Sequence, residues 1–132
     1  MSRDCIHVLL VEDNPGDVRL VREMLTEGSD DDFDVVCATT VRDAVERLTT
    51  ETARIDAVLL DLSLPDDTGL NTLRRVVAAA RTAVVVVMTG AGDEELGLTS
   101  LREGAQDYLV KGQVDGRTLR RAPRLALSRQ TV

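Results

Sequence analysis

Apolar, strand-like runs alternate with amphipathic segments five times along the chain. The first run, 6–11, is interrupted only by His7, and the others lie at 33–37, 57–60, 83–87 and 107–111. Short runs of this kind predict buried strands, and apolar residues at helical spacing predict a helix after each one. Five strand–helix units with short connections predict an α/β fold. We expect a single five-stranded parallel sheet, (βα)5, doubly wound and flavodoxin-like.

Local signals mark the ends of several predicted elements. Asn14 is a good N-cap and Pro15 suits the first helical position, so a helix should begin there and end near Gly28. The acidic segment 29–34, SDDDFD, is expected to form a solvated loop. A turn is expected around Pro65, between the third strand and its helix.

The composition is that of a single globular domain. The chain has 132 residues, of which 43% are hydrophobic and 30% charged, so we expect one domain over 1–132 with its core at about 5–129. Phe33 and Tyr108 are the only aromatic residues, so Val, Leu, Ile and Ala must form the core. Cys5 and Cys37 lie beside apolar runs and are expected to be reduced, buried thiols, with a disulfide or a metal site as the alternative.

The net charge, the length of the apolar runs and the amino terminus indicate which partners and which location to expect. A net charge of −7 argues against direct nucleic-acid binding, because a polyanion repels an acidic surface. No apolar run approaches the roughly 20 residues of a membrane-spanning helix, so no membrane partner is expected. The first ten residues, MSRDCIHVLL, lack the long apolar stretch and cleavage site of a signal peptide. These features favour a cytoplasmic location.

Residues capable of chemistry follow the ends of four predicted strands. The first strand is followed by Glu12 and Asp13, the third by Asp61, the fourth by Thr89 and the fifth by Lys111, the only lysine. In a doubly wound fold, ligands bind beyond the carboxyl ends of the strands, so these side chains should meet at one edge. Asp56 should lie at the opposite end of the third strand.

The chemistry of this set suggests phosphoryl transfer. Clustered carboxylates repel one another unless a cation neutralises them, and a few hard oxygen ligands suit Mg²⁺. An aspartate can also act as a nucleophile and form an aspartyl phosphate. Lys111 would then supply a positive charge, and Thr89 a hydrogen-bond donor, to the phosphoryl oxygens.

Four motifs carry a family resemblance: VLLVEDNPGD, VLLDLSLPDDTG, VVVVMTG and DYLVKG. In order and spacing they resemble the receiver domain of two-component response regulators, over about Cys5 to Arg129. The resemblance implies that Asp61 accepts a phosphoryl group from the phosphohistidine of a histidine kinase or a phosphotransfer protein. It also implies that Asp13, Asp61 and the main-chain carbonyl of Ser63 bind Mg²⁺, with Glu12 contributing through water.

The resemblance assigns roles to three further residues. Lys111 would contact the phosphoryl group, Thr89 would move to bond it, and Tyr108 would turn inward on activation. Glu12 stands where many members have aspartate. Gly112 stands where the family often has a proline with a cis bond, so the loop is either trans and rearranged or strained.

Two positions tune phosphate hydrolysis in the family. Ser63 and Ala91 lie two residues after Asp61 and Thr89, and neither carries an acid or amide that would orient an attacking water. We therefore predict slow self-dephosphorylation.

No separate output domain is expected, so the switch would act through its own surface. We expect the surface around the fourth and fifth βα units to contact an unidentified downstream protein. The last helix carries Arg117, Arg120, Arg121, Arg124 and Arg129, and the preceding unit carries Asp93, Glu94, Glu95, Glu103 and Asp107. These charges are either two solvated faces or partners across a homodimer. Pro123 lies inside the last helix and should bend it.

Two other functions stay open. The chain would be a degenerate receiver, a binding module independent of phosphorylation, if its aspartate does not react. A small Mg²⁺-dependent phosphatase that uses an aspartyl phosphate is the other alternative. That class carries a second aspartate two residues after the nucleophile, where this chain has Ser63. We therefore expect no enzyme beyond self-catalysed phosphorylation and dephosphorylation.

Overall fold

Five parallel strands form one sheet in the order β2-β1-β3-β4-β5, and the fold class predicted from the sequence is confirmed. The computed structural model describes residues 5–27, 32–50, 54–64, 66 and 69–130. The strands are β1 (Ile6–Val11), β2 (Phe33–Ala38), β3 (Ala57–Asp61), β4 (Val84–Thr89) and β5 (Asp107–Val110). The helices are α1 (Pro15–Thr26), α2 (Val41–Thr49), α3 (Gly69–Ala80), α4 (Glu94–Arg102) and α5 (Gly116–Gln130).

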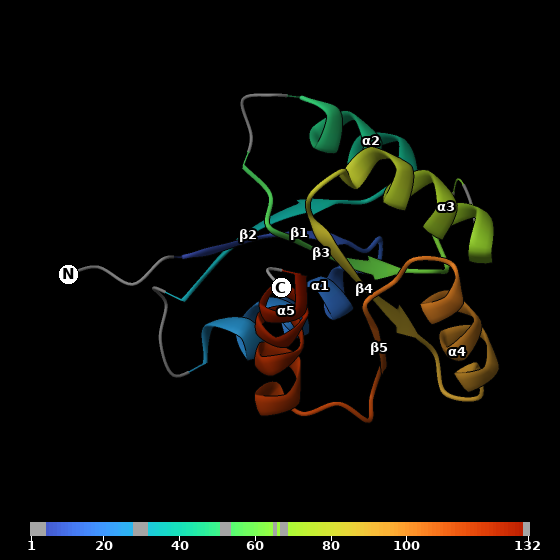
Figure 1. The fold of residues 1–132 in the computed structure, drawn as a ribbon. Coiled ribbons are helices and arrows are strands. Elements are labelled where there is room, and N and C mark those ends of the chain that lie inside the picture. Colours follow the sequence, from blue (N-terminus) through green and yellow to red (C-terminus); the bar gives the residue numbers. More distant parts are fainter. Residues whose placement is uncertain (1–4, 28–31, 51–53, 65, 67–68, 131–132) are drawn as a thin grey trace.

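Helices cover both faces of the sheet (Figure 1). One core lies between the sheet and α1 and α5, and it contains Val8 and Leu10 of β1. The other lies between the sheet and α2, α3 and α4, and it contains Leu9 and Val11 of the same strand. Successive side chains of a strand point to opposite faces, so the central strands are apolar throughout because both faces are buried.

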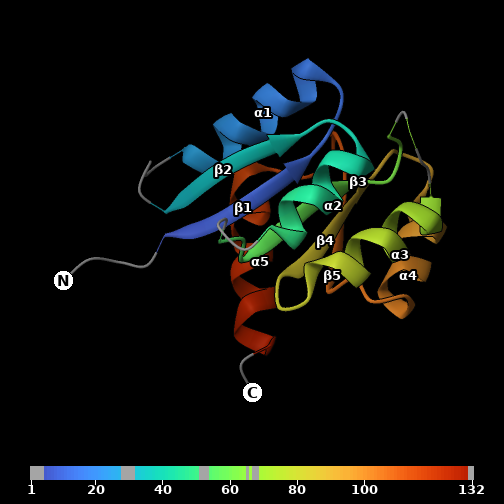
Figure 2. The same ribbon diagram turned by 90° about the horizontal axis from the view of Figure 1, so that it is seen from above.

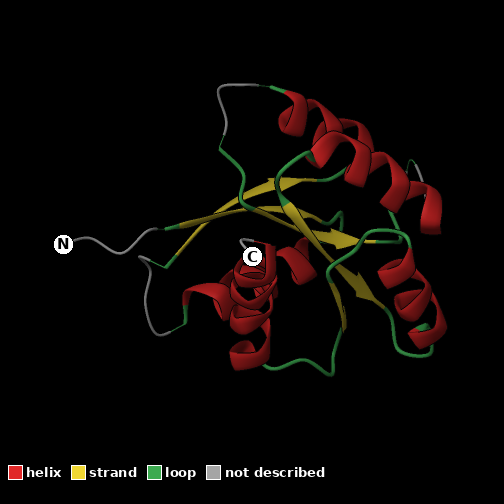
Figure 3. Cartoon of the chain, viewed as in Figure 1, coloured by secondary structure: helices red, strands yellow, loops and turns green. Residues whose placement is uncertain are grey.

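Helices α2 and α3 pack side by side on one face of the sheet. Seen from above, α2 and α3 lie next to each other over the sheet (Figure 2). Loops drawn in green join β4 to α4 and β5 to α5 (Figure 3). Parallel pairing of β1 with β3, of β3 with β4 and of β4 with β5 brings four carboxyl ends together at one edge of the sheet.

The predicted start of the first helix is correct. The side chain of Asn14 accepts a hydrogen bond from the backbone N–H of Asp17, and Pro15 follows as the first helical residue. Asp115 acts in the same way before α5, where its carboxylate accepts from the N–H of Thr118 at 2.8 Å. Gly28, Pro65 and residues 29–31 lie outside the described residues.

The strand predicted from Phe33 is confirmed, so the solvated loop predicted over 29–34 is wrong where the two predictions overlap and also at Asp32, whose side chain is mostly covered. Phe33 and Asp34 belong to β2, and the carboxylate of Asp32 pairs with Arg124 of α5 at 2.9 Å. Only 14% of the Asp32 side chain is exposed, because the guanidinium of Arg124 covers it and also lies 5.1 Å from the centre of the Phe33 ring. Long-range pairing of this kind has no local sequence signal.

The structure also describes the two cysteines, the helix that contains Pro123 and the apolar character of the helices. Cys5 and Cys37 are free thiols, and both are half-buried. Helix α5 continues through Pro123. No described helix is long and apolar enough to cross a membrane.

Candidate functional site

The carboxyl ends of the strands bring the predicted residues to one edge. Glu12 and Asp13 follow β1, Asp61 and Thr89 are the last residues of β3 and β4, and Lys111 follows β5. Asp56 lies at the other end of β3, where its carboxylate accepts from the backbone N–H of His7 at 2.9 Å. Asp56 therefore lies at the amino end of β3, away from the other acids, as the sequence predicted.

Three carboxylates form what we call the acidic cluster: Glu12, Asp13 and Asp61. Each offers an oxygen, and these oxygens all lie within 4.8 Å of one another. Glu12 and Asp61 are buried, at 0% and 4% exposure, whereas Asp13 is exposed. Two buried acids beside an exposed one form a site that is open to solvent on one side.

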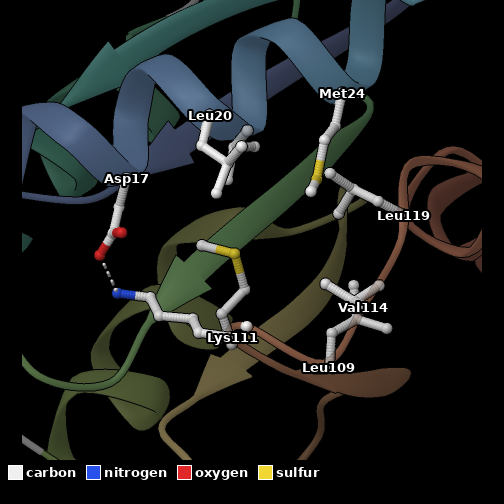
Figure 4. Close-up of a pocket in the computed structure, with 10 residues that line it drawn as sticks. Asp17, Leu20, Met24, Leu109, Lys111, Val114 and Leu119 are labelled. Atoms are coloured by element: carbon white, nitrogen blue, oxygen red, sulfur yellow. Dashed lines mark hydrogen bonds and ion pairs between the residues drawn. The ribbon is translucent and has the colours of Figure 1, made fainter.

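Lys111 is the cation of this edge. Its Nζ lies 2.6 Å from Glu12 Oε1, 3.1 Å from Asp17 Oδ2 and 3.2 Å from Asp61 Oδ2. The pair with Asp17 is visible in Figure 4, where the lysine reaches from β5 towards α1. A single ammonium group therefore links residues from the ends of β1 and β3 and from the first turn of α1.

Asp17 was missed in the sequence-based prediction. It lies on α1 rather than directly after a strand, so the rule that ligands lie at strand ends does not find it. The signal that was available is its place in the first turn of the helix that directly follows Glu12 and Asp13. Its proximity to Lys111 depends on how α1 packs beside β5.

Burial and neighbouring charges shift the pKa values of Glu12 and Lys111. Burial raises the pKa of Glu12 from 4.5 to about 7, and the neighbouring Asp61 adds to this effect, whereas the bond to Lys111 opposes it. Burial by itself would lower the pKa of Lys111, but the carboxylates of Glu12, Asp61 and Asp17 outweigh it and hold that pKa above its ordinary value. The lysine therefore stays charged, and Glu12 ionises less readily than an ordinary glutamate.

Thr89 and Ser63 are close neighbours of Asp61. Thr89 ends the adjacent strand β4, and Ser63 follows Asp61 by two residues. Thr89 is buried at the end of β4, and its hydroxyl has no hydrogen-bond partner within the described part of the chain. A buried hydroxyl without a partner is costly, so it is a place where a ligand oxygen would bind favourably. The backbone N–H of Ser63 donates to Asp61 Oδ1 at 3.1 Å, which fixes the orientation of that carboxylate.

The loop after Lys111 answers one question that the sequence left open. The described residues contain no cis peptide bond, so Lys111–Gly112 is trans. Gly112 has a φ of 84°, in the left-handed region that glycine adopts without strain. The loop is therefore the rearranged, trans form of the two alternatives.

The acidic cluster fits a small divalent cation. Mg²⁺ prefers oxygen ligands and is usually bound by one or two carboxylates together with water and phosphate oxygens. Three carboxylate oxygens lie within 4.8 Å of one another, and a cation would neutralise this concentration of negative charge. The described carboxylates could therefore hold such an ion.

Comparison with known proteins agrees with this geometry. The family model of the response regulator receiver domain matches residues 8–122. Regulatory protein LuxO of Vibrio cholerae is 36% identical over 102 residues, which cover 77% of this chain and 21% of LuxO. A protein-glutamate methylesterase/protein-glutamine glutaminase of Paramagnetospirillum magneticum is 37% identical over 114 residues, covering 83% of this chain and 31% of that protein. The chain thus spans a third or less of these relatives.

The fold matches as well. The crystal structure of a response regulator receiver domain protein from Clostridium thermocellum has a TM-score of 0.81 at 25% identity, over 96% of this chain and 97% of that one. The family match extends over most of the chain and contains all of the predicted site residues. The chain therefore belongs to the response regulator receiver domain family of two-component signalling proteins.

Proposed function

We propose that the chain is a signalling switch in which Asp61 accepts a phosphoryl group from the phosphohistidine of a histidine kinase or a phosphotransfer protein. The observation that carries this proposal is the position of Asp61. It is a buried carboxylate at the end of a central strand, 3.2 Å from an ammonium group and within 4.8 Å of oxygens of two other acids. Receiver domains are switches rather than classical enzymes, and we propose the same for this chain.

The reaction needs a carboxylate nucleophile and a good leaving group. An oxygen of Asp61 attacks phosphorus, the P–N bond to the donor imidazole breaks, and the electron pair of that bond stays on the imidazole nitrogen. Ser63 holds Asp61 Oδ1 through its backbone N–H, so the carboxylate is already oriented for attack. The product is an aspartyl phosphate at Asp61.

Mg²⁺ would be held by Asp13, Asp61 and the main-chain carbonyl of Ser63, with Glu12 contributing through water. When bound, the ion supplies neutralising charge for the phosphoryl oxygens. Asp13 is the exposed member of the acidic cluster, so it is the acid that an entering hydrated ion meets first. Glu12 is buried and paired with Lys111, which agrees with an indirect role.

Lys111 and Thr89 would bind the phosphoryl group. Lys111 stays protonated because three carboxylates surround it, so it can give a full positive charge to a phosphoryl oxygen. The unpaired hydroxyl of Thr89 would donate to a second oxygen. Movement of Thr89 would be passed to Tyr108 on the neighbouring strand β5, whose ring packs in the core beneath α4.

The surface of α4, β5 and α5 would carry the signal to an unidentified downstream protein. It exposes Leu98 and Leu101 on α4 and Leu125 on α5. Of the arginines on α5, Arg124 already pairs with Asp32, and Arg120 donates to the carbonyl of Met24 at 2.8 Å. Arg117, Arg121 and Arg129 are exposed and would be the arginines available to a partner or a second copy in a homodimer.

The experiment is an intact-mass measurement after incubation with acetyl phosphate and Mg²⁺. We expect a gain of one phosphoryl group, which requires Mg²⁺ and disappears in Asp61→Asn. Asp56→Asn is the matched control, because it removes an acid from the other end of the same strand and should leave the reaction intact. No gain from acetyl phosphate or from a phosphorylated histidine donor would favour the binding module instead.

The metal site is tested separately by calorimetric titration with Mg²⁺. We expect Asp13→Asn to weaken binding by about tenfold or more, which is the usual effect of removing a metal ligand's charge or support. Asp34→Asn removes an equal charge from the exposed surface of β2 and should have little effect. Equal affinities for the two variants would contradict the assignment of Asp13.

A further inference from the structure

A cavity of about 180 Å³ lies between α1, the last two strands and α5. Its walls are mostly apolar and come from Leu20, Val21, Met24, Met88, Leu109, Gly112, Val114 and Leu119. Figure 4 shows the labelled side chains of Leu20, Met24, Val114 and Leu119 around one common space. Only Asp17 and Lys111 contribute charged groups, and they lie together at one end of that space.

The floor and walls of the cavity belong to the packed core. Val21, Met88, Leu109 and Leu119 are all buried, at 8% exposure or less. Leu20, at 47% exposure, forms part of the open side, and Gly112 has no side chain that would cover it. The space is therefore a deep pocket with an entrance rather than a groove along the surface.

The size and lining of the pocket define what it would bind. An apolar cavity of about 150 Å³ in another protein stays dry and binds benzene. The pocket in this chain is slightly larger, and its two methionines can adjust their shape around an occupant because the thioether side chain is flexible. A small ring compound would fit, whereas a peptide or a nucleotide would not.

The end of the pocket formed by Asp17 and Lys111 favours a ligand that carries a polar substituent. Asp17 Oδ2 and Lys111 Nζ lie 3.1 Å apart at the boundary of the pocket, so both can form hydrogen bonds with a group placed beside them. The rest of the lining offers no charged side chain. A ligand with one polar group on an otherwise apolar ring would therefore place that group at this end.

We propose that this pocket binds a small, ring-sized apolar molecule with a single polar substituent, which contacts the Asp17–Lys111 pair. Lys111 belongs to both the pocket and the acidic edge, so an occupant would touch a residue of the candidate phosphorylation site. The binding itself needs neither Mg²⁺ nor a phosphoryl donor. Its success or failure can thus be separated from that of the proposed function.

The chain contains three methionines, and two of them, Met24 and Met88, line the pocket. Labelling the methionine methyl groups with carbon-13 therefore gives two reporters in the pocket. Benzene and phenol are the two probes, titrated in metal-free buffer. We expect saturable shifts of the Met24 and Met88 methyl signals, dissociation constants in the millimolar range or below, and tighter binding of phenol.

Two variants fill the pocket from different sides. Val114→Phe fills it from the loop between β5 and α5, and Leu20→Trp fills it from the exposed face of α1, where the fold should tolerate a larger side chain. Circular dichroism identifies a variant that fails to fold, in which case the other is used. Each folded variant should bind both probes at least tenfold more weakly.

Two results would overturn the proposal. The pocket is not a binding site if benzene and phenol cause no saturable shift of the Met24 and Met88 signals, or if the folded variants that fill it bind the probes as tightly as the wild type. The assignment of the polar end is wrong if phenol binds no more tightly than benzene.

Discussion

The ring of Tyr108 lies so close to the backbone of Gly97 that a Cβ atom on Gly97 would be 2.7 Å from the ring atoms Cγ and Cε2. Gly97 is buried in the middle of α4, and Tyr108 is in β5. Glycine inside a helix costs roughly 1 kcal/mol relative to alanine. The close approach of the ring gives a physical reason for a glycine there, and it couples the position of α4 to that of the proposed switch residue.

Gly97→Ala should therefore have opposite effects in two backgrounds. With Tyr108 present, the added methyl group must displace the ring, and we expect a loss of about 1–3 kcal/mol in the free energy of unfolding. With Tyr108→Ala the clash is absent, so the same change should stabilise the protein by about 1 kcal/mol. Urea denaturation of the four proteins, followed by circular dichroism, measures this coupling.

The chain has one tyrosine and no tryptophan, so its intrinsic fluorescence reports Tyr108 directly. Gly97→Ala should change the emission intensity and the quenching of that residue. If Gly97→Ala has the same sign in both backgrounds, the ring contact does not explain the glycine.

Removal of Lys111 should produce a pH-dependent loss of stability. In Lys111→Met, Glu12 stays buried without its cation, so its pKa rises further above the value in the unfolded chain. The folded variant then binds a proton that the unfolded chain has released, and its stability falls as pH rises above about 4.5. We expect little loss near pH 5 and a loss of about 3 kcal/mol near pH 8.

Chemical denaturation in metal-free buffer at several pH values measures this effect. In the double variant Glu12→Gln/Lys111→Met the group that titrates is absent, so most of the added pH dependence should disappear. A loss that is the same at all pH values would show that Lys111 acts through packing rather than charge.

Asp66 links the loop after β3 to the start of α2. Its two carboxylate oxygens accept hydrogen bonds from the backbone N–H groups of Val41 at 2.9 Å and Arg42 at 3.1 Å. The bond from Val41 is the main reason that the pKa of Asp66 lies below its ordinary value. An exposed carboxylate is screened by water, so Asp66→Ala should cost less than about 1 kcal/mol at neutral pH.

The stabilisation that Asp66 contributes should depend on pH in a definite direction. A lowered pKa means that the stabilisation is present above the ordinary value of 3.8 and is lost as pH falls through the depressed one. Denaturation curves of wild type and Asp66→Ala should therefore converge in acid. Asp66→Asn keeps an acceptor oxygen and should lose less, so equal losses in the two variants would contradict a capping role.

The phosphorylated form should be long-lived. Ser63 is exposed two residues after Asp61, where a hydroxyl is a poor group for orienting an attacking water. We expect a half-life of minutes or longer after removal of the donor, followed by intact mass. Ser63→Asn introduces an amide and should shorten the half-life by about tenfold. A wild-type half-life of seconds would refute this prediction.

Periodicity alone was enough to predict the fold of this chain. A sheet with helices on both faces buries every side chain of its central strands. Such strands therefore appear in the sequence as unbroken apolar runs, which can be recognised locally. The meeting of Glu12, Asp13, Asp61, Thr89 and Lys111 at one edge also followed from sequence. The carboxyl ends of neighbouring parallel strands must lie together, whatever the details of packing.

Other relationships depend on how elements that are distant in sequence pack together. Asp17 reaches Lys111, Arg124 covers Asp32 and Asp66 caps α2, and each pair joins residues at least 24 positions apart. The trans bond at Gly112 was one of two conformations that the sequence allowed.

The sequence by itself determined which elements form and which ends of the strands carry chemistry, because both follow from local periodicity and from the rules of parallel sheets. Only the tertiary structure decided the side-chain partners of Lys111, the contact of Tyr108 with Gly97 and the pocket beneath α1. These depend on the relative positions of packed helices and on side-chain rotamers, which arise from the whole set of contacts at once.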